Sequence, residues 1–133
     1  MLTRARAIRQ LGEGDLFNAE DDEGPTRICL VTSVTETTIV TRSVTVQEII
    51  EFDRESGVAT PPFNFVITSV AELPRDIHDV FLGLDQKYRE GKIRRAKDPT
   101  WKRPSGDLAL TDDQSRAFEF SYYFYKANPL PSA

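Results

Sequence analysis

Two runs of β-branched residues, 26–35 (TRICLVTSVT) and 37–45 (TTIVTRSVT), are separated by a single residue, Glu36. Val, Ile and Thr favour extended backbone because their branched side chains fit the pleated surface of a sheet. A connection this short brings the second run back beside the first, as in a β-hairpin. We therefore predict an antiparallel hairpin, and the rest of the chain must pack around the sheet that contains it.

Other short strands and turns are expected in the first half. Residues 15–19 and 63–70 have strand-like composition, and the acidic segment 20–25, which ends in Gly-Pro, is predicted to be a solvated turn. Because segment 63–70 is apolar on both faces, it is predicted to be a central strand that is covered on both sides. Residues 1–12 are expected to form a short helix that two following glycines end.

Two features of the predicted sheet stay open. Segment 46–53 is either a short helical turn or a strand, because its start matches a helix capping box whereas Ile50 and Phe52 alternate as in a strand. Arg42 shares one face of its strand with valines. Its guanidinium group is therefore expected either to reach the edge of the sheet or to pair with an acid.

A helix over residues 72–90 is the clearest element of the second half. Its apolar side chains recur on one face, at helical spacing: Leu73, Ile77, Val80, Phe81, Leu84 and Tyr88. Gly91 is a natural residue to end this helix. Two prolines then predict an irregular connection over residues 92–106.

A second helix is predicted over residues 111–126. Thr111 and Gln114 match a capping box, with two acids in the first turn, and an Asn-Pro pair ends the segment. We therefore expect one α+β domain spanning residues 1–133. It combines a small, mainly antiparallel sheet of four or five strands, or an SH3-like partial barrel, with the two helices packed against it. This likeness of fold carries no functional weight.

Composition excludes several classes of protein. The net charge of -4 argues against general polyanion binding, and the single cysteine, Cys29, allows no disulfide within the chain. Apolar neighbours predict that Cys29 is a small buried hydrophobe. No apolar run resembles a secretory signal or approaches the ~20 residues of a membrane span. A cytoplasmic protein without membrane contact is expected.

No motif in the sequence predicts catalysis, and neither a metal site nor a cofactor is expected. The only histidine, His78, lies one residue from the apolar stripe of its helix and is interpreted as a surface or rim residue. The alternative is an enzyme in which His78 acts as a general base beside a carboxylate. Glycine-rich phosphate loops and spaced metal ligands are absent from the sequence.

Residues 87–103 form a basic strip. Eight basic residues against two acidic ones, Glu90 and Asp98, give it a net charge of +6, whereas the other residues carry 9 basic and 19 acidic side chains, a net -10. The cations are Lys87, Arg89, Lys92, Arg94, Arg95, Lys97, Lys102 and Arg103. They predict one of two roles. The first is a solvated surface that pairs with the acidic body, meaning the rest of the chain, or with an acidic partner. The second is a nucleic-acid contact assisted by nearby aromatic residues.

The segment 118–125 holds six of the 13 aromatic residues. At about 100° per residue, a helix here places Phe118, Tyr122 and Tyr125 on one side, and Phe120 and Phe124 on the other with Tyr123 nearby. A surface helix needs only one apolar face, so the second must be covered by the chain's own termini or by another chain. A strand is the alternative interpretation, because aromatic residues also alternate in this segment.

These aromatic residues give the predicted function. We expect a non-enzymatic module that binds a protein partner or self-associates through Phe118, Phe120, Tyr122, Tyr123, Phe124 and Tyr125. Trp101 is expected to fold over the core as a plug, or else to be an exposed anchor that adds to the binding. Nucleic-acid binding through the basic strip is the alternative function.

Overall fold

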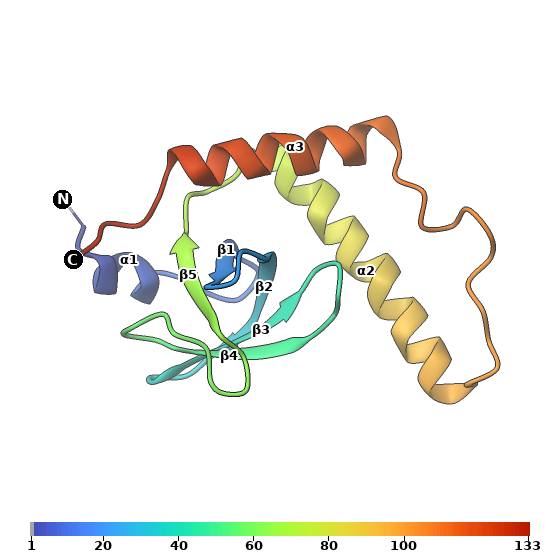
Figure 1. The fold of residues 1–133 in the computed structure, drawn as a ribbon, viewed down its shortest axis with the longest axis horizontal. Coiled ribbons are helices and arrows are strands. Elements are labelled where there is room, and N and C mark those ends of the chain that lie inside the picture. Colours follow the sequence, from blue (N-terminus) through green and yellow to red (C-terminus); the bar gives the residue numbers. More distant parts are fainter. Residues whose placement is uncertain (1) are drawn as a thin grey trace.

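The computed structural model describes residues 2–133, which form five strands and three helices (Figure 1). In chain order the elements are α1 (Arg4–Arg9), β1 (Leu16–Asp21), β2 (Thr26–Val34), β3 (Thr38–Ser43), β4 (Ile49–Asp53), β5 (Phe65–Ser69), α2 (Arg75–Lys97) and α3 (Asp112–Ala127). The strands form one sheet in the order β4-β3-β2-β1-β5, with every neighbouring pair antiparallel. The predicted α+β class and the predicted hairpin, β2–β3, are both confirmed. Residue 1 of the predicted first helix lies outside the described range.

The sheet curls into a half-barrel because a short segment, residues 57–60, bonds to both of its edge strands. The amide of Asp53 in β4 donates to the carbonyl of Val58 (2.8 Å). One residue further on, the amide of Ala59 donates to the carbonyl of Phe65 in β5 (2.9 Å). These bonds draw the two edges of the sheet towards each other and satisfy backbone groups that an open edge would expose.

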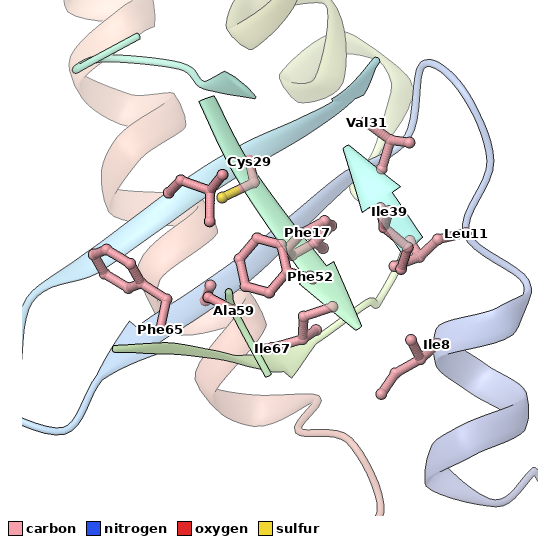
Figure 2. Close-up of a cluster of buried hydrophobic side chains, with 12 residues drawn as sticks. Ile8, Leu11, Phe17, Cys29, Val31, Ile39, Phe52, Ala59, Phe65 and Ile67 are labelled. Carbon is pink, nitrogen blue, oxygen red and sulfur yellow. The ribbon is translucent and has the colours of Figure 1, made fainter. Parts of the chain in front are cut away.

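The inner face of the curled sheet encloses the first of two cores (Figure 2). Phe17 and Phe52 meet edge to face within it, with ring centroids 5.2 Å apart. Ile8 of α1 and Leu130 of the C-terminal tail pack against the same cluster. The short helix and the tail therefore close the part of the core that the sheet leaves open.

The second core lies between the outer face of the sheet and the two long helices. Its buried members are Leu16, Leu30 and Val44 from the sheet side, Leu73, Phe81 and Leu84 in or just before α2, and Ala117 and Tyr125 from α3. Both helices thus pack on the outer face of the sheet, which leaves the inner face to α1 and the tail. This arrangement determines which side of α3 remains available for contact.

The prediction that segment 63–70 is a central strand is wrong. β5 is an edge strand, which pairs with β1 alone among the strands. Its apolar residues on both faces have another cause: Phe65 and Ile67 face the inner core, while Val66 is bridged by Val58 in the closing segment. Coverage of an edge by a nearby loop thus has the same sequence pattern as a position inside the sheet.

Segment 46–53, which the sequence left open, contains β4. The preceding residues make a tight turn in which Gln47 has a φ of 62°, a left-handed conformation that side chains other than Gly seldom adopt. Glu48, which completes the apparent capping box, instead donates its amide to Ser43 Oγ (3.0 Å). Glu48 therefore belongs to a hairpin turn in this chain and does not start a helix.

α2 is longer than predicted. It begins at Arg75 after Pro74 and continues through Gly91 to Lys97, so the predicted end at residue 90 and the irregular start at 92 are wrong. A Cβ atom at position 91 would overlap the guanidinium group of Arg103, which packs against the helix there. Gly91 is therefore explained by close packing of a side chain and not by a helix end.

The start of α3 agrees with the prediction. Thr111 Oγ1 accepts from the amide of Gln114 (3.2 Å), and Gln114 Oε1 accepts from the amide of Thr111 (2.9 Å). This reciprocal capping box satisfies two amides that the first helical turn leaves unpaired. Residues 118–125 are accordingly helical, and the alternative interpretation as a strand is wrong.

Cys29 lies in the inner core with no exposed surface, as predicted. Burial raises the pKa of its thiol to about 12. We expect a disulfide-exchange reagent at about pH 8 to leave the folded protein unmodified, because only an accessible thiolate reacts. The same reagent in denaturant is expected to modify one thiol per chain, measured by absorbance. Rapid labelling without denaturant would contradict this placement.

Candidate functional site

The side of α3 that faces the core is a narrow stripe. Ala117, Ser121 and Tyr125 recur every four residues and are at most 3% exposed. Phe118 lies beside them and packs edge to face on Phe81 of α2, with ring centroids 5.1 Å apart. Because Ala117 and Ser121 are small, the helix approaches the sheet closely and needs little of its surface to complete the core.

The outer side of α3 carries a second apolar surface. We call it the aromatic face and define it as Ile77, Phe120, Tyr123 and Phe124. The rings of Phe120 and Phe124 lie nearly parallel, with centroids 5.5 Å apart and an angle of 22° between their planes. Phe120 is 42% exposed and Tyr123 is 63% exposed. Arg116 and Glu119 line the margin of this shallow, largely apolar depression.

The structure separates the six predicted contact residues of α3 into three groups. Phe118 and Tyr125 belong to the second core, whereas Phe120, Tyr123 and Phe124 line the aromatic face, with Phe124 also packing partly against that core. Tyr122 lines a pocket together with Phe118 and Tyr125, as the predicted shared side requires, but it is 54% exposed and its ring lies under the ammonium group of Lys126. The small side chains of Ala117 and Ser121 occupy the positions nearest the sheet, so the buried stripe is narrower than the aromatic pattern suggests.

Neither end of the described chain covers the aromatic face. The tail returns to the sheet, where the amide of Leu130 donates to the carbonyl of Thr68 (2.8 Å) and its side chain joins the inner core. The last residue, Ala133, accepts from the amide of Arg4 (3.1 Å) at the start of α1. Both ends thus meet beside α1 (Figure 1), away from the crossing of α2 and α3.

The basic strip, residues 87–103, is a projecting arm. α2 carries its first part beyond the sheet, and the chain returns to α3 by a long connection (Figure 1). Every residue from 92 to 100 is exposed. We call the whole of residues 87–103 the basic arm. The extension of α2 through Gly91 therefore makes most of the strip helical and holds its charge at a distance from the acidic body.

Side-chain contacts hold the connection against the arm. Arg103 donates to Asp107 (2.9 Å), and Lys87 lies 4.0 Å from the same carboxyl group. Trp101 is half-buried, with the guanidinium carbons of Arg94 and Arg103 5.2 Å and 5.7 Å from the centre of its ring. Trp101 thus lies in the arm, outside both cores and apart from the aromatic face, so its position does not match the predicted core plug.

Several cations of the arm have no anionic partner in the molecule. Lys92 donates to the backbone carbonyl of Gln47 (2.6 Å). Within residues 2–133, the members of the arm that form no ion pair are Arg89, Lys92, Arg94, Arg95, Lys97 and Lys102. The predicted pairing of the strip with the chain's own acidic body is therefore limited to Asp107.

A buried polar network anchors the base of the arm to the sheet. Arg42 donates to both carboxylate oxygens of Asp85 in α2, at 2.9 Å and 2.7 Å. Gln47 Nε2 donates to the same carboxylate (2.9 Å). Burial opposes the charge on Asp85, but the hydrogen bonds from Arg42 and Gln47 outweigh it and lower the pKa of Asp85 below its ordinary value. The expectation that Arg42 would pair with an acid is confirmed.

His78 lines a polar cleft between α2 and the segment that joins α1 to β1. The cleft has a volume of about 540 Å³ and is also lined by Glu13, Asp15 and Glu72. No hydrogen bond joins the His78 side chain to any residue between 2 and 133. Among those residues, no group of three or more His, Cys, Asp or Glu side chains is arranged to hold a metal ion.

Comparison with protein-family models, with curated proteins and with solved structures finds no match to the chain. Within residues 2–133, no helix combines the length and apolar character needed to cross a lipid bilayer.

Ile77, predicted on the core stripe of α2, packs partly against the second core and also contributes to the aromatic face, because α3 crosses the helix there. Two residues that matter to these surfaces were missed in the sequence. Asp85 follows the core residue Leu84, and only a tertiary contact identifies it as the partner of Arg42. Gln47 has no sequence signal for its left-handed backbone, since Gly or Asn is the usual residue at such positions.

Proposed function

We propose that the protein is a non-enzymatic interaction module that binds another protein chain through the aromatic face. The observation that supports this proposal is that Phe120 and Tyr123 stay exposed although both ends of the described chain pack elsewhere. Exposed aromatic side chains that form a contiguous surface mark interaction sites more often than scattered ones do. The cytoplasm, where a lone buried thiol such as Cys29 stays reduced, is its proposed compartment.

The chemistry of the aromatic face suits the centre of an interface. Aromatic residues with an Arg at the margin are typical of the few side chains that dominate binding energy. The parallel rings of Phe120 and Phe124 offer a flat apolar surface, and the hydroxyl of Tyr123 can remain hydrated at its edge. A standard interface buries about 800 Å² on each partner, so polar parts of α2 and α3 would form the rim.

Adjacent tyrosines of α3 provide a matched test. Tyr123→Ser is expected to weaken partner binding at least about tenfold, because it removes a ring from the aromatic face. Tyr122→Ser removes a neighbouring ring that is 54% exposed and lies outside the aromatic face; because it contacts Tyr123 edge to face (5.2 Å between ring centroids), it is expected to weaken binding much less than Tyr123→Ser does. The measurement is differential capture from the native cell extract, followed by titration of the captured protein. Equal loss in both variants, or in neither, would contradict the proposal.

Nucleic-acid binding by the basic arm is a second candidate function. It is favoured by the helical extension that holds unpaired cations clear of the acidic body. An exposed helix fits the major groove of DNA, and binding through phosphates would weaken steeply with salt. Trp101 already contacts two guanidinium groups, which makes it a poor platform for stacking on bases. Absence of binding to DNA or RNA at low salt would exclude this function.

A further inference from the structure

We infer that the partner is a second copy of this chain, whose basic arm docks on the aromatic face of the first. This inference rests on the proposed function, because it names the occupant of the same face. The basic arm of one molecule contacts the aromatic face of another, and this arrangement differs from a symmetric contact between two aromatic faces. Three observations support it: the chemistry of the two surfaces, their separation within one chain, and the distribution of charge.

The two surfaces are chemically complementary. The faces of aromatic rings attract cations. Of the two charged residues at the margin of the aromatic face, Arg116 pairs with Asp113 (2.8 Å), whereas Glu119 forms no ion pair within residues 2–133. The arm offers the matching groups, because Arg95 and Lys97 are exposed and have no anionic partner in the described chain. The arm also exposes an apolar side chain, Ile93, at 43%. A cationic segment with an apolar residue is what an aromatic surface beside a carboxylate would bind.

The arm cannot reach the aromatic face of its own chain. Ile77 of the face and Arg95 of the arm belong to the same continuous helix, α2. Eighteen residues of straight helix separate them by about 27 Å. The contacts of Asp85 with Arg42 and Gln47 hold that helix on the sheet. Any contact between arm and face must therefore be between two molecules.

Charge favours contact between unlike surfaces over contact between like ones. Residues 87–103 carry +6 and the other residues carry -10. Docking an arm on the body of a neighbour brings opposite charges together, whereas two bodies meeting face to face would repel each other. A contact of this kind leaves one arm and one face free unless the two molecules exchange arms, so it generates rings or chains, or a reciprocal dimer.

Two variants separate the two halves of the contact. The face variant is Phe120→Ser with Tyr123→Ser, and the arm variant is Arg95→Glu with Lys97→Glu. The charge control is Arg6→Glu with Lys126→Glu, which changes net charge equally outside both surfaces. All of these positions are exposed, so the variants are expected to fold. Circular dichroism would verify that each variant keeps its helices.

Sedimentation velocity over a range of protein and salt concentrations is the measurement. The wild type and the charge control are expected to associate, and added salt to weaken the association. Each of the two surface variants alone is expected to associate at least about tenfold more weakly. An equimolar mixture of them is expected to form a 1:1 complex, because the intact arm of one meets the intact face of the other.

Three outcomes would overturn the inference. A wild type that stays monomeric throughout would remove the second copy as occupant, and differential capture with the Tyr123 and Tyr122 variants would then decide whether another protein binds the face. Association that needs the face but not the arm would indicate a symmetric dimer. Failure of the mixed variants to form a complex would show that arm and face do not meet. DNA binding lost only in the arm variant of a monomeric protein would assign the arm to nucleic acid.

Discussion

Asp85→Ala is expected to lower the free energy of unfolding by about 3–5 kcal/mol, because it leaves the guanidinium group of Arg42 partly buried without its counter-charge. The side chains of Arg42 and Asp85 are only 19% and 7% exposed. Gln47, whose amide donates to the same carboxylate, would lose a hydrogen bond as well. Urea denaturation followed by circular dichroism gives the change directly.

The exposed pair of Arg75 and Asp79 is the control for this prediction. Its side chains are 80% and 56% exposed, so Asp79→Ala is expected to cost less than about 1 kcal/mol. A loss of similar size in both variants would show that burial of the Arg42–Asp85 pair has no special effect.

The pH dependence of stability provides a second readout of the same ion pair. The pKa of Asp85 is lower in the folded protein than its ordinary value of 3.8, so the folded state binds this proton less readily than the unfolded state does. The contribution of Asp85 is therefore complete above the unfolded pKa and declines as pH falls through it towards the folded pKa. The difference in stability between wild type and Asp85→Ala should shrink below about pH 4. A difference that grows in acid would contradict the assignment.

Phe52→Ala is expected to lower the free energy of unfolding by about 3–5 kcal/mol, through lost burial and the cavity left behind. Phe52 is fully buried in β4 and packs edge to face on Phe17. β4 also bonds to residues 57–60, which close the half-barrel. The backbone around Phe52 is therefore held on both sides and cannot move far to fill the cavity. Denaturant titration measures the effect, with an unchanged slope expected if only stability changes.

Val46→Ala is the control for the Phe52 variant. Val46 lies in the turn before β4 and is 51% exposed, so its truncation is expected to change stability by no more than about 0.5 kcal/mol. A loss below about 1 kcal/mol in Phe52→Ala would mean that neighbouring side chains refill the site.

The parts of the fold that sequence predicts well are those decided by neighbouring residues. The β2–β3 hairpin follows from two β-branched runs around Glu36, and the start of α3 follows from Thr111 and Gln114. Both signals act over a few residues and meet no tertiary competitor. The opposed aromatic sides of α3 were predictable for the same reason, since helical geometry alone separates Phe118 from Phe120.

The parts that sequence mispredicts depend on contacts between distant residues. Gly91 looks like a helix end, but Arg103, in the following loop, makes it a packing position inside α2. The position of β5 depends on closure by residues 57–60, and the exposure of Tyr122 depends on which residues of α3 lie nearest the sheet. None of these contacts leaves a periodic trace in the sequence. For the candidate site, sequence therefore supplied the aromatic residues but not the face that they form.

The two ends of the described chain meet beside α1, and this has a topological consequence. Because the amide of Arg4 bonds to the carbonyl of Ala133, the described backbone is nearly a closed ring. A short flexible linker could join the ends, and the break could be moved to the exposed connection between α2 and α3. Such a circular permutant would keep every strand pairing and both cores, while leaving the helical part of the basic arm at one free end of the chain. The length of the arm could then be changed without altering the sheet or either core.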